Sequence, residues 1–157
     1  MVAASELEAL ARRAEIDGTA PRVGVIIDRE GQVLLLERDD TGPVKVPLKL
    51  PGATVKTGES LAEAVARGVR EETGLVVTGI RHHVGDFDYL SPDARPVRRL
   101  HFAVDVAAFE PIHLTAHARY VWAPLDGQLR VTSSIRGILG AYRDLVRDGN
   151  PRAGSPS

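Results

Sequence analysis

A short acidic segment holds side chains that could bind a divalent cation. Glu71 and Glu72 are adjacent carboxylates, and Arg67 lies one helical turn before them. At about 100° per residue, position 68 shares a helix face with both glutamates. Adjacent carboxylates repel each other unless they are solvated or share a hard cation such as Mg²⁺, which prefers oxygen ligands. A bare carbonyl at Gly52 could complete such a shell, and a solvated acidic face is the ordinary alternative.

A helix over residues 60–73 must present this acidic face. Ser60 and Glu63 have the spacing of a capping box, in which each side chain accepts a hydrogen bond from the other's backbone N–H. Gly74 stands where a left-handed C-terminal cap belongs. The apolar stripe beside the acidic face, which should pack on the core, consists of Leu61, Val65 and Val69.

The rest of the chain predicts a mixed α/β protein, because strand-like and helix-like periods alternate along it. We expect helices over residues 5–16, capped by Ser5, and over 134–147. We expect strands over 22–28 and 33–38, joined as a hairpin, and over 75–84, 97–109 and 119–123, with a loop at 85–96. These elements divide the chain into an N-terminal helical extension (1–20), one domain (21–147) and a disordered tail (148–157).

Residues 51–75, PGATVKTGESLAEAVARGVREETGL, resemble the Nudix box. That box reads glycine, five residues, glutamate, seven residues, Arg-Glu, an apolar residue, any residue, Glu-Glu, any residue, glycine and an apolar residue. The matching positions are Glu59, Arg67, Val69, Glu71, Glu72, Gly74 and Leu75. The Leu-Pro-Gly before the box, the hairpin ending in Arg38 and the aromatic strand HARYVW (117–122) are also similar to the family, so the resemblance covers residues 22–147.

The resemblance implies an α/β/α sandwich around a central mixed sheet. It also implies hydrolysis of a nucleoside diphosphate linked to another group, with Mg²⁺ or Mn²⁺. Negative pyrophosphate oxygens repel a nucleophile, and divalent ions neutralise that charge. By the resemblance, Glu71 and Glu72 would bind metal, joined by the Gly52 carbonyl. Arg67 would orient the carboxylates, and Glu59 would brace the loop or assist the metal.

Three positions depart from the family. Ala53 replaces the first glycine of the box, and Gly68 replaces the glutamate that commonly binds metal or acts as base. Glycine inside a helix also costs about 1 kcal/mol relative to alanine. Ala116 stands where relatives often carry a further acid. Loss of catalysis, room for a bulky substrate, or a base supplied from elsewhere would each account for Gly68.

His117 is the candidate for a replacement base. An imidazole with an ordinary pKa of about 6.5 can take a proton from water near neutral pH. Nudix enzymes that hydrolyse GDP-mannose resemble this arrangement, with an altered box and a histidine before the same aromatic strand. The alternative is an exposed loop histidine without a catalytic role.

Aromatic and basic side chains elsewhere could bind substrate. Phe87 and Tyr89, at the start of the 85–96 loop, could stack on a base or sugar, although packing in the core is the more common role. Arg38, at the end of the hairpin, is a further substrate-binding candidate. The cluster Arg95, Arg98 and Arg99 could bind phosphates or form a solvated strand edge. The strand histidines, His82, His83 and His101, fit packing better than a zinc site.

Composition limits the remaining classes of function. The chain has 157 residues, 43% hydrophobic and 26% charged, a net charge of −1 and no cysteine. These values predict a cytoplasmic globular protein without disulfides or thiolate metal sites. Neither a nucleic-acid partner nor a membrane partner is expected, because there is no basic surplus and no apolar run approaching about 20 residues. We expect a small nucleotide-derived substrate and leave a homodimer open.

Two hypotheses of function follow. The first is a Nudix pyrophosphohydrolase acting on a nucleotide sugar, dinucleotide or modified nucleoside triphosphate. The second is a weakened or inactive Nudix-fold module that binds or senses nucleotides. Retention of Glu59, Arg67, Glu71 and Glu72 favours the enzyme, whereas the changes at positions 68 and 116 favour the binding module.

Overall fold

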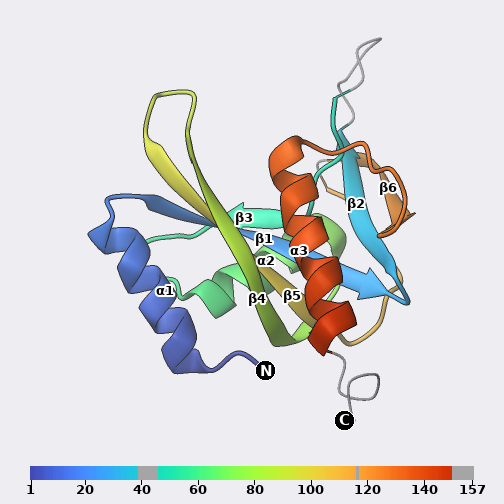
Figure 1. Ribbon diagram of the computed structural model, residues 1–157, viewed down its shortest axis with the longest axis horizontal. Helices are drawn as coiled ribbons and strands as arrows, with labels where there is room; N and C mark the ends of the chain where they lie inside the picture. The colour runs from blue at the N-terminus through green and yellow to red at the C-terminus, as the bar shows by residue number, and fades with distance from the viewer. Residues whose placement is uncertain (39–45, 116, 150–157) are drawn as a thin grey trace.

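A computed structural model of the chain describes residues 1–38, 46–115 and 117–149 (Figure 1). Its helices are α1 (Ala4–Ile16), α2 (Leu61–Thr73) and α3 (Ser133–Gly149). Its strands are β1 (Ala20–Arg29), β2 (Gln32–Arg38), β3 (Gly52–Thr54), β4 (Val77–Leu90), β5 (Pro96–Val106) and β6 (His117–Pro124). Ala116 and residues 150–157 of the predicted disordered tail lie outside the described residues.

The strands form one mixed sheet, which confirms the predicted class of fold. The strand order is β4-β5-β1-β2-β6, and β3 pairs with β1. The β1–β5 pair is parallel, and the other pairs are antiparallel. Helix α3 lies across one face of the sheet and α2 lies behind it (Figure 1). The outcome is the α/β/α sandwich expected of a Nudix fold.

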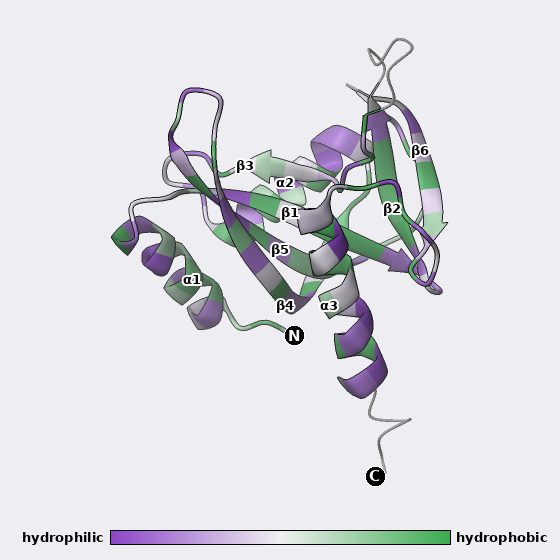
Figure 2. Cartoon of the chain, turned by 45° about the horizontal axis from the view of Figure 1, so that its top comes forward, coloured by the Kyte–Doolittle hydropathy of each residue, from purple (hydrophilic) through white to green (hydrophobic). Residues whose placement is uncertain are grey.

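Each face of the sheet has its own hydrophobic core. Because side chains alternate along a strand, Val23, Val25 and Ile27 of β1 pack toward α2, whereas Ile26 packs toward α3. The central strands β1 and β2 are the most continuously hydrophobic part of the chain (Figure 2). None of the helices in the described ranges combines the length and the apolar character that a membrane span requires.

The sequence patterns predicted both ends of α2 correctly, but they did not predict the start of α1. The Ser60–Glu63 capping box is present, and Gly74 ends α2 in the left-handed conformation, with φ of 78°, so both predictions are confirmed. Ser5 as the cap of α1 is wrong, because the helix begins at Ala4 without a side-chain cap. The Val2 amide donates to the Ile80 carbonyl of β4, so a tertiary contact holds the chain just before α1.

Strand β4 extends well past its predicted end. It runs to Leu90 and pairs with β5 up to the hairpin turn, where Leu90 opposes Pro96. Register shifts along the β4–β5 pair, the last between His83 and Gly85, interrupt the alternation that a sequence pattern relies on. The predicted loop at 85–96 is therefore wrong, and the turn between the strands is confined to residues 91–95.

Candidate active site

Arg67 joins two of the predicted site carboxylates. Its Nε donates to Glu59 at 2.7 Å, and its Nη1 donates to Glu71 at 2.9 Å. Its Nη2 donates to the Thr54 carbonyl at 2.7 Å and to the second Glu59 oxygen at 3.0 Å. These bonds tie the loop after β3 to the middle and the end of α2. Arg67 thus fixes where the Glu71 carboxylate lies.

The ion pair between Glu59 and Arg67 shifts the pKa of both groups. Hydrogen bonds from Arg67 and from the Lys56 amide lower the pKa of Glu59 to about 2. The Glu59 hydrogen bond in turn raises the pKa of Arg67. Both groups therefore stay charged at neutral pH. Their side chains are only 13% and 15% exposed, so the pair is a fixed part of the fold.

Glu72 is held by a different set of contacts. Its Oε1 accepts a hydrogen bond from the Gly52 amide at 2.8 Å, and its Oε2 lies 3.6 Å from Lys49 Nζ. A Cβ at Gly52 would meet the Val23 carbonyl oxygen at 2.3 Å, so only glycine permits β3 to approach β1 this closely. The Pro-Gly step therefore places backbone against the carboxylates of α2.

Gly68 lies against the same backbone. A Cβ at position 68 would meet Ala53 Cβ at 2.8 Å and the Gly52 carbonyl oxygen at 3.0 Å. The Gly52 oxygen thus faces the same side of α2 as the two glutamates. Ala53 and Gly68 are also the two box positions at which this chain departs from the family. The Ala53 methyl group lies where a side chain at position 68 would begin, so the two departures are sterically coupled.

The loop before β6 runs beside the end of α2. Thr115 Oγ1 donates to the Glu71 carbonyl at 2.9 Å, and the His113 amide donates to the Thr73 carbonyl at 2.8 Å. His117, two residues after Thr115, opposes Arg38 in the β2–β6 register. The backbone therefore brings the predicted base and a predicted substrate-binding residue together near the acidic end of α2.

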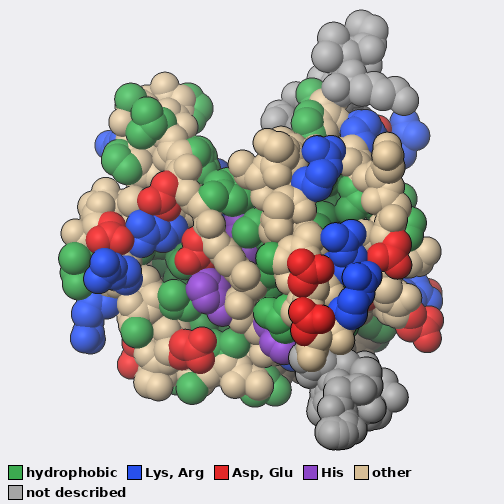
Figure 3. Space-filling view, in the orientation of Figure 1, with side chains coloured by type: hydrophobic (Ala, Val, Ile, Leu, Met, Phe, Trp, Pro, Cys, Tyr) green, Lys and Arg blue, Asp and Glu red, His purple; other side chains and the backbone are tan. Residues whose placement is uncertain are grey.

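Phe87 and Tyr89 lie on the opposite face of the sheet from α2. They are strand residues rather than loop residues, with ring centroids 6.1 Å apart. The Phe87 ring also lies 5.1 Å from the ring of His101. Figure 3 shows the surface hollowed between the tip of the β4–β5 hairpin and α3. Both aromatic side chains are half-buried on this side, where a flat ligand group could reach them.

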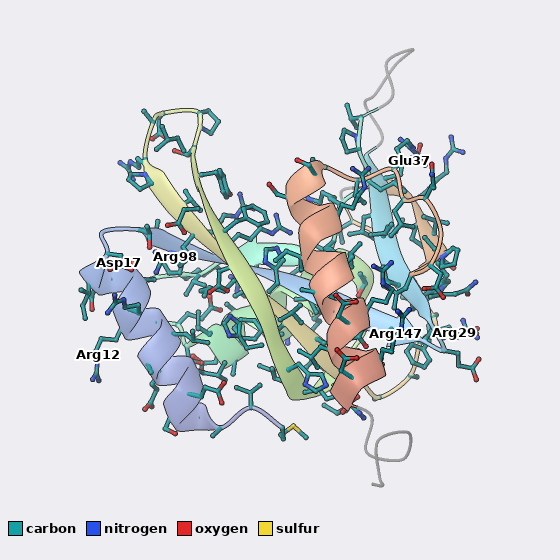
Figure 4. The ribbon with its side chains drawn as sticks, in the orientation of Figure 1. Arg12, Asp17, Arg29, Glu37, Arg98 and Arg147 are labelled. Atoms are coloured by element: carbon teal, nitrogen blue, oxygen red, sulfur yellow. The ribbon has the colours of Figure 1, made fainter. Side chains whose placement is uncertain are left out.

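The predicted arginine cluster is divided among three environments. Arg98 donates to Asp88 at 2.8 Å and to Asp17 at 2.9 Å, which fastens β5 to β4 and to the end of α1 (Figure 4). Arg95 lies beside Asp93 at the hairpin turn. Arg99 lies on the α3 face, and its Nε has no hydrogen-bond acceptor among the described residues. Sequence proximity alone could not separate these roles, because alternate residues of a strand point to opposite faces.

A large cavity lies away from the acidic site. It has a volume of about 700 Å³ and is bounded by α3 and the loop after β6, with Arg130, Arg136 and Arg143 in its wall. Lysine and arginine side chains gather on this side of the molecule (Figure 3). Arg130 and Arg136 donate to backbone carbonyls there, so they hold the loop in place. A smaller cavity of about 500 Å³ adjoins Glu59 and Arg67.

Comparison with known proteins agrees with the fold and the box. The NUDIX domain family matches residues 18–132, and the chain therefore belongs to the Nudix family. It is 38% identical over 95 residues to an ADP-ribose pyrophosphatase of Methanocaldococcus jannaschii, covering 57% of this chain and 54% of that one. It is 29% identical over 89 residues to the phosphatase NudJ of Escherichia coli K12, covering 57% and 56%. The matched region thus spans about half the length of these relatives.

A solved structure shows the same architecture. The solution structure of the E. coli ORF135 protein superimposes with a TM-score of 0.71 at 24% identity, covering 85% of this chain and 94% of that one. At this identity the likeness concerns the fold alone. The curated relatives of this chain thus include an ADP-ribose pyrophosphatase and a phosphatase.

Proposed function

We propose that this protein hydrolyses a nucleoside diphosphate linked to another group, with help from Mg²⁺ or Mn²⁺. The observation that carries the proposal is the Arg67 network, which holds Glu59 and Glu71 in one arrangement at the end of α2. A helix that merely exposed its charges to solvent would not need a half-buried arginine with every nitrogen bonded. The name of the M. jannaschii relative, an ADP-ribose pyrophosphatase, supports the same substrate class.

The oxygen donors at this site fit a divalent ion that shares its shell with substrate. The described residues contain no group of three His, Asp or Glu side chains placed to hold a metal. Mg²⁺ is commonly bound by one or two carboxylates together with substrate phosphates. Glu71, Glu72 and the Gly52 carbonyl match that requirement. The bound ion would supply charge neutralisation at the phosphate oxygens.

The protein's own residues have distinct tasks in this scheme. Arg67 orients Glu71, and Glu59 fixes Arg67 through two hydrogen bonds. His117 takes a proton from the attacking water, in place of the acids missing at positions 68 and 116. Arg38 and the aromatic pair Phe87 and Tyr89 are the candidates for binding the groups of the substrate beyond the cleaved phosphates.

A nucleotide-binding module without turnover is the second candidate. It is favoured by the contact at Gly68, because Ala53 and the Gly52 carbonyl fill the space where the usual third carboxylate would begin. A protein under selection for binding alone could accept that loss. The two candidates differ in whether any phosphate ester or anhydride is cleaved.

A hydrolysis screen tests the proposal. Purified protein is incubated with ADP-ribose, nucleotide sugars, dinucleotides and nucleoside triphosphates, with Mg²⁺ or Mn²⁺, and phosphorylated products are measured. We expect turnover of at least one compound and a loss of about 10²-fold or more in Glu72→Gln. Glu8→Gln, an exposed change on α1, is the matched control and should retain parent activity. Metal-dependent binding without turnover of any compound would favour the binding module instead.

A further inference from the structure

Two arginines lie side by side on the face of the sheet opposite α2. In the parallel β1–β5 pair, Arg22 and Arg99 are direct partners in the register. Gly24 and Ile26 of β1 share their face, and Ile26 packs on α3. Like charges placed directly opposite each other destabilise a sheet unless something compensates them. The pair therefore calls for a negative partner.

The described residues do not provide that partner. The Nε atoms of both arginines are buried and have no hydrogen-bond acceptor. The polar contacts that remain are long: Arg22 Nη1 to the Tyr89 hydroxyl and Arg99 Nη2 to the Leu50 carbonyl, each at 3.4 Å. Burial lowers the pKa of Arg99, and the Arg22 charge lowers it further. Arg98, the neighbouring residue on the other face of β5, by contrast has two carboxylate partners, Asp17 and Asp88.

Gly24 leaves space on the face of β1 for the side chains of Arg99 and His101. A Cβ at Gly24 would meet Arg99 Nε at 2.8 Å and His101 Nε2 at 2.9 Å, so the absence of a side chain there lets both groups lie over the strand. His101 is fully buried, and its Nε2 also lacks a partner. The Nδ1 of His101 donates to the Gly85 carbonyl, so its Nε2 carries the lone pair of a neutral ring and is not a donor to an anion. Two arginine Nε–H donors without acceptors remain on this face, and such donors are what an anion requires.

This face meets the acidic site at Gly52. Arg99 Nη2 would lie 3.1 Å from a Cβ at Gly52, and the Gly52 amide donates to Glu72. The Glu72 charge also acts on Arg99, opposing the effects of burial and of Arg22. Across the strands, Phe87, Arg99 and Arg22 stand in one row of the register. An anionic group held by the arginines would adjoin both the carboxylate edge and an aromatic ring.

We propose that Arg22 and Arg99 form a phosphate-binding subsite, which takes the phosphate group of the substrate next to the one held at the end of α2. This inference rests on the proposed function for the identity of the ligand. The substrate then carries two linked phosphates across Gly52, and its next group lies toward Phe87 and Tyr89. A substrate with a single phosphate cannot occupy both subsites.

Binding of inorganic pyrophosphate without metal tests the subsite separately from hydrolysis. Calorimetric titration in EDTA is made on the parent protein and on Arg99→Met and Arg22→Met. Charge-assisted hydrogen bonds predict binding about 10- to 100-fold weaker in each variant. Arg12→Met removes one positive charge from the exposed surface of α1 (Figure 4) and should bind as the parent does.

Thermal unfolding of the same proteins separates a ligand site from a structural role. Removing one of two buried like charges should leave the melting temperature unchanged or raise it. The subsite is disproved if the parent does not bind pyrophosphate, or if the Arg99 and Arg12 variants weaken binding equally. It is also disproved if both sheet variants melt well below the parent, because the arginines then serve the fold. Failure of the hydrolysis screen leaves these binding results unaffected.

Discussion

Arg67 and Arg99 are half-buried arginines on opposite faces of one sheet, and their surroundings differ completely. Every nitrogen of Arg67 donates to an oxygen, and its two carboxylate partners hold it fixed. Arg99 has a buried Nε without an acceptor and stands opposite another arginine. Because every nitrogen of Arg67 is hydrogen-bonded, Arg67 holds its neighbours in place. The Nε of Arg99 has no such partner and is therefore available to a ligand. The difference suggests that reactivity and substrate binding are divided between the two faces.

His117 gives the largest expected effect on the reactive side. Loss of general-base assistance predicts that His117→Ala lowers kcat by about 10²–10⁴-fold while leaving pyrophosphate binding unchanged. Activity of the parent should also fall as the pH is lowered, because a protonated imidazole cannot accept a proton from water. The measurement is a pH–rate profile on whichever substrate turns over best.

The matched control for this change is His113→Ala, which alters an exposed histidine in the loop just before β6. Coinciding profiles of the parent and the His117 variant would assign the base to another group. In that case Glu59, Glu71 or a substrate phosphate must serve. An Arg99→Met variant should instead bind pyrophosphate more weakly than the parent, whereas the His117 variant should bind it as the parent does.

Removal of Arg67 should have a somewhat smaller effect on rate and a clear effect on stability. Arg67→Met leaves Glu59 without its partner and lets Glu71 move, so we expect about 10²-fold lower kcat/KM and a lower melting temperature. Arg70→Met removes the same charge from an exposed position one turn away. Equal behaviour of the two variants would mean that the Arg67 network is a surface feature.

The steric coupling of Ala53 and Gly68 predicts a non-additive pair. Gly68→Glu alone should destabilise the fold by about 1–3 kcal/mol, because its Cβ overlaps Ala53. The double variant Ala53→Gly with Gly68→Glu should recover most of that loss and bind Mn²⁺ more tightly than the parent. Denaturant unfolding and Mn²⁺ titration of all four proteins complete the cycle. Additive free energies would show that the two positions are independent.

Local sequence patterns predicted one side of this comparison and missed the other. The Ser60–Glu63 box, the Gly74 cap and the spacing of the α2 carboxylates all lie within one segment, so short-range rules suffice. The Arg22–Arg99 contact joins residues far apart in sequence through a parallel register, which no local pattern specifies. Gly24 between two β-branched residues was the available signal, since glycine inside a strand can mark close approach.

His101 should have no effect on the rate and should appear only in the pH dependence of stability. Burial, assisted by the Arg99 charge, lowers the pKa of His101 to about 4, from an ordinary value of about 6.5. The unfolded chain therefore binds a proton first as the pH falls. Stability should be complete above about pH 6.5 and decline toward pH 4, by at most about 1.4 kcal/mol per pH unit.

Urea unfolding between pH 7 and pH 4 checks this dependence. His101→Gln cannot titrate, so its stability should change less with pH than that of the parent in this window. The pKa of His82 is also lowered by burial, but His82 is common to both proteins and cancels in the difference. Parallel curves for the two proteins would contradict the assignment to His101.

The position of the glutamates within α2 has a consequence for heat stability. Glu71 and Glu72 occupy the last turn of the helix, where the aligned peptide dipoles leave a partial negative charge. A carboxylate at that pole is disfavoured by roughly 0.3–1 kcal/mol, and Arg67 and Lys49 offset this only from the side of the helix. A cation at this end would relieve that repulsion. Mn²⁺ should therefore raise the melting temperature with increasing concentration in the parent, and less in Glu72→Gln.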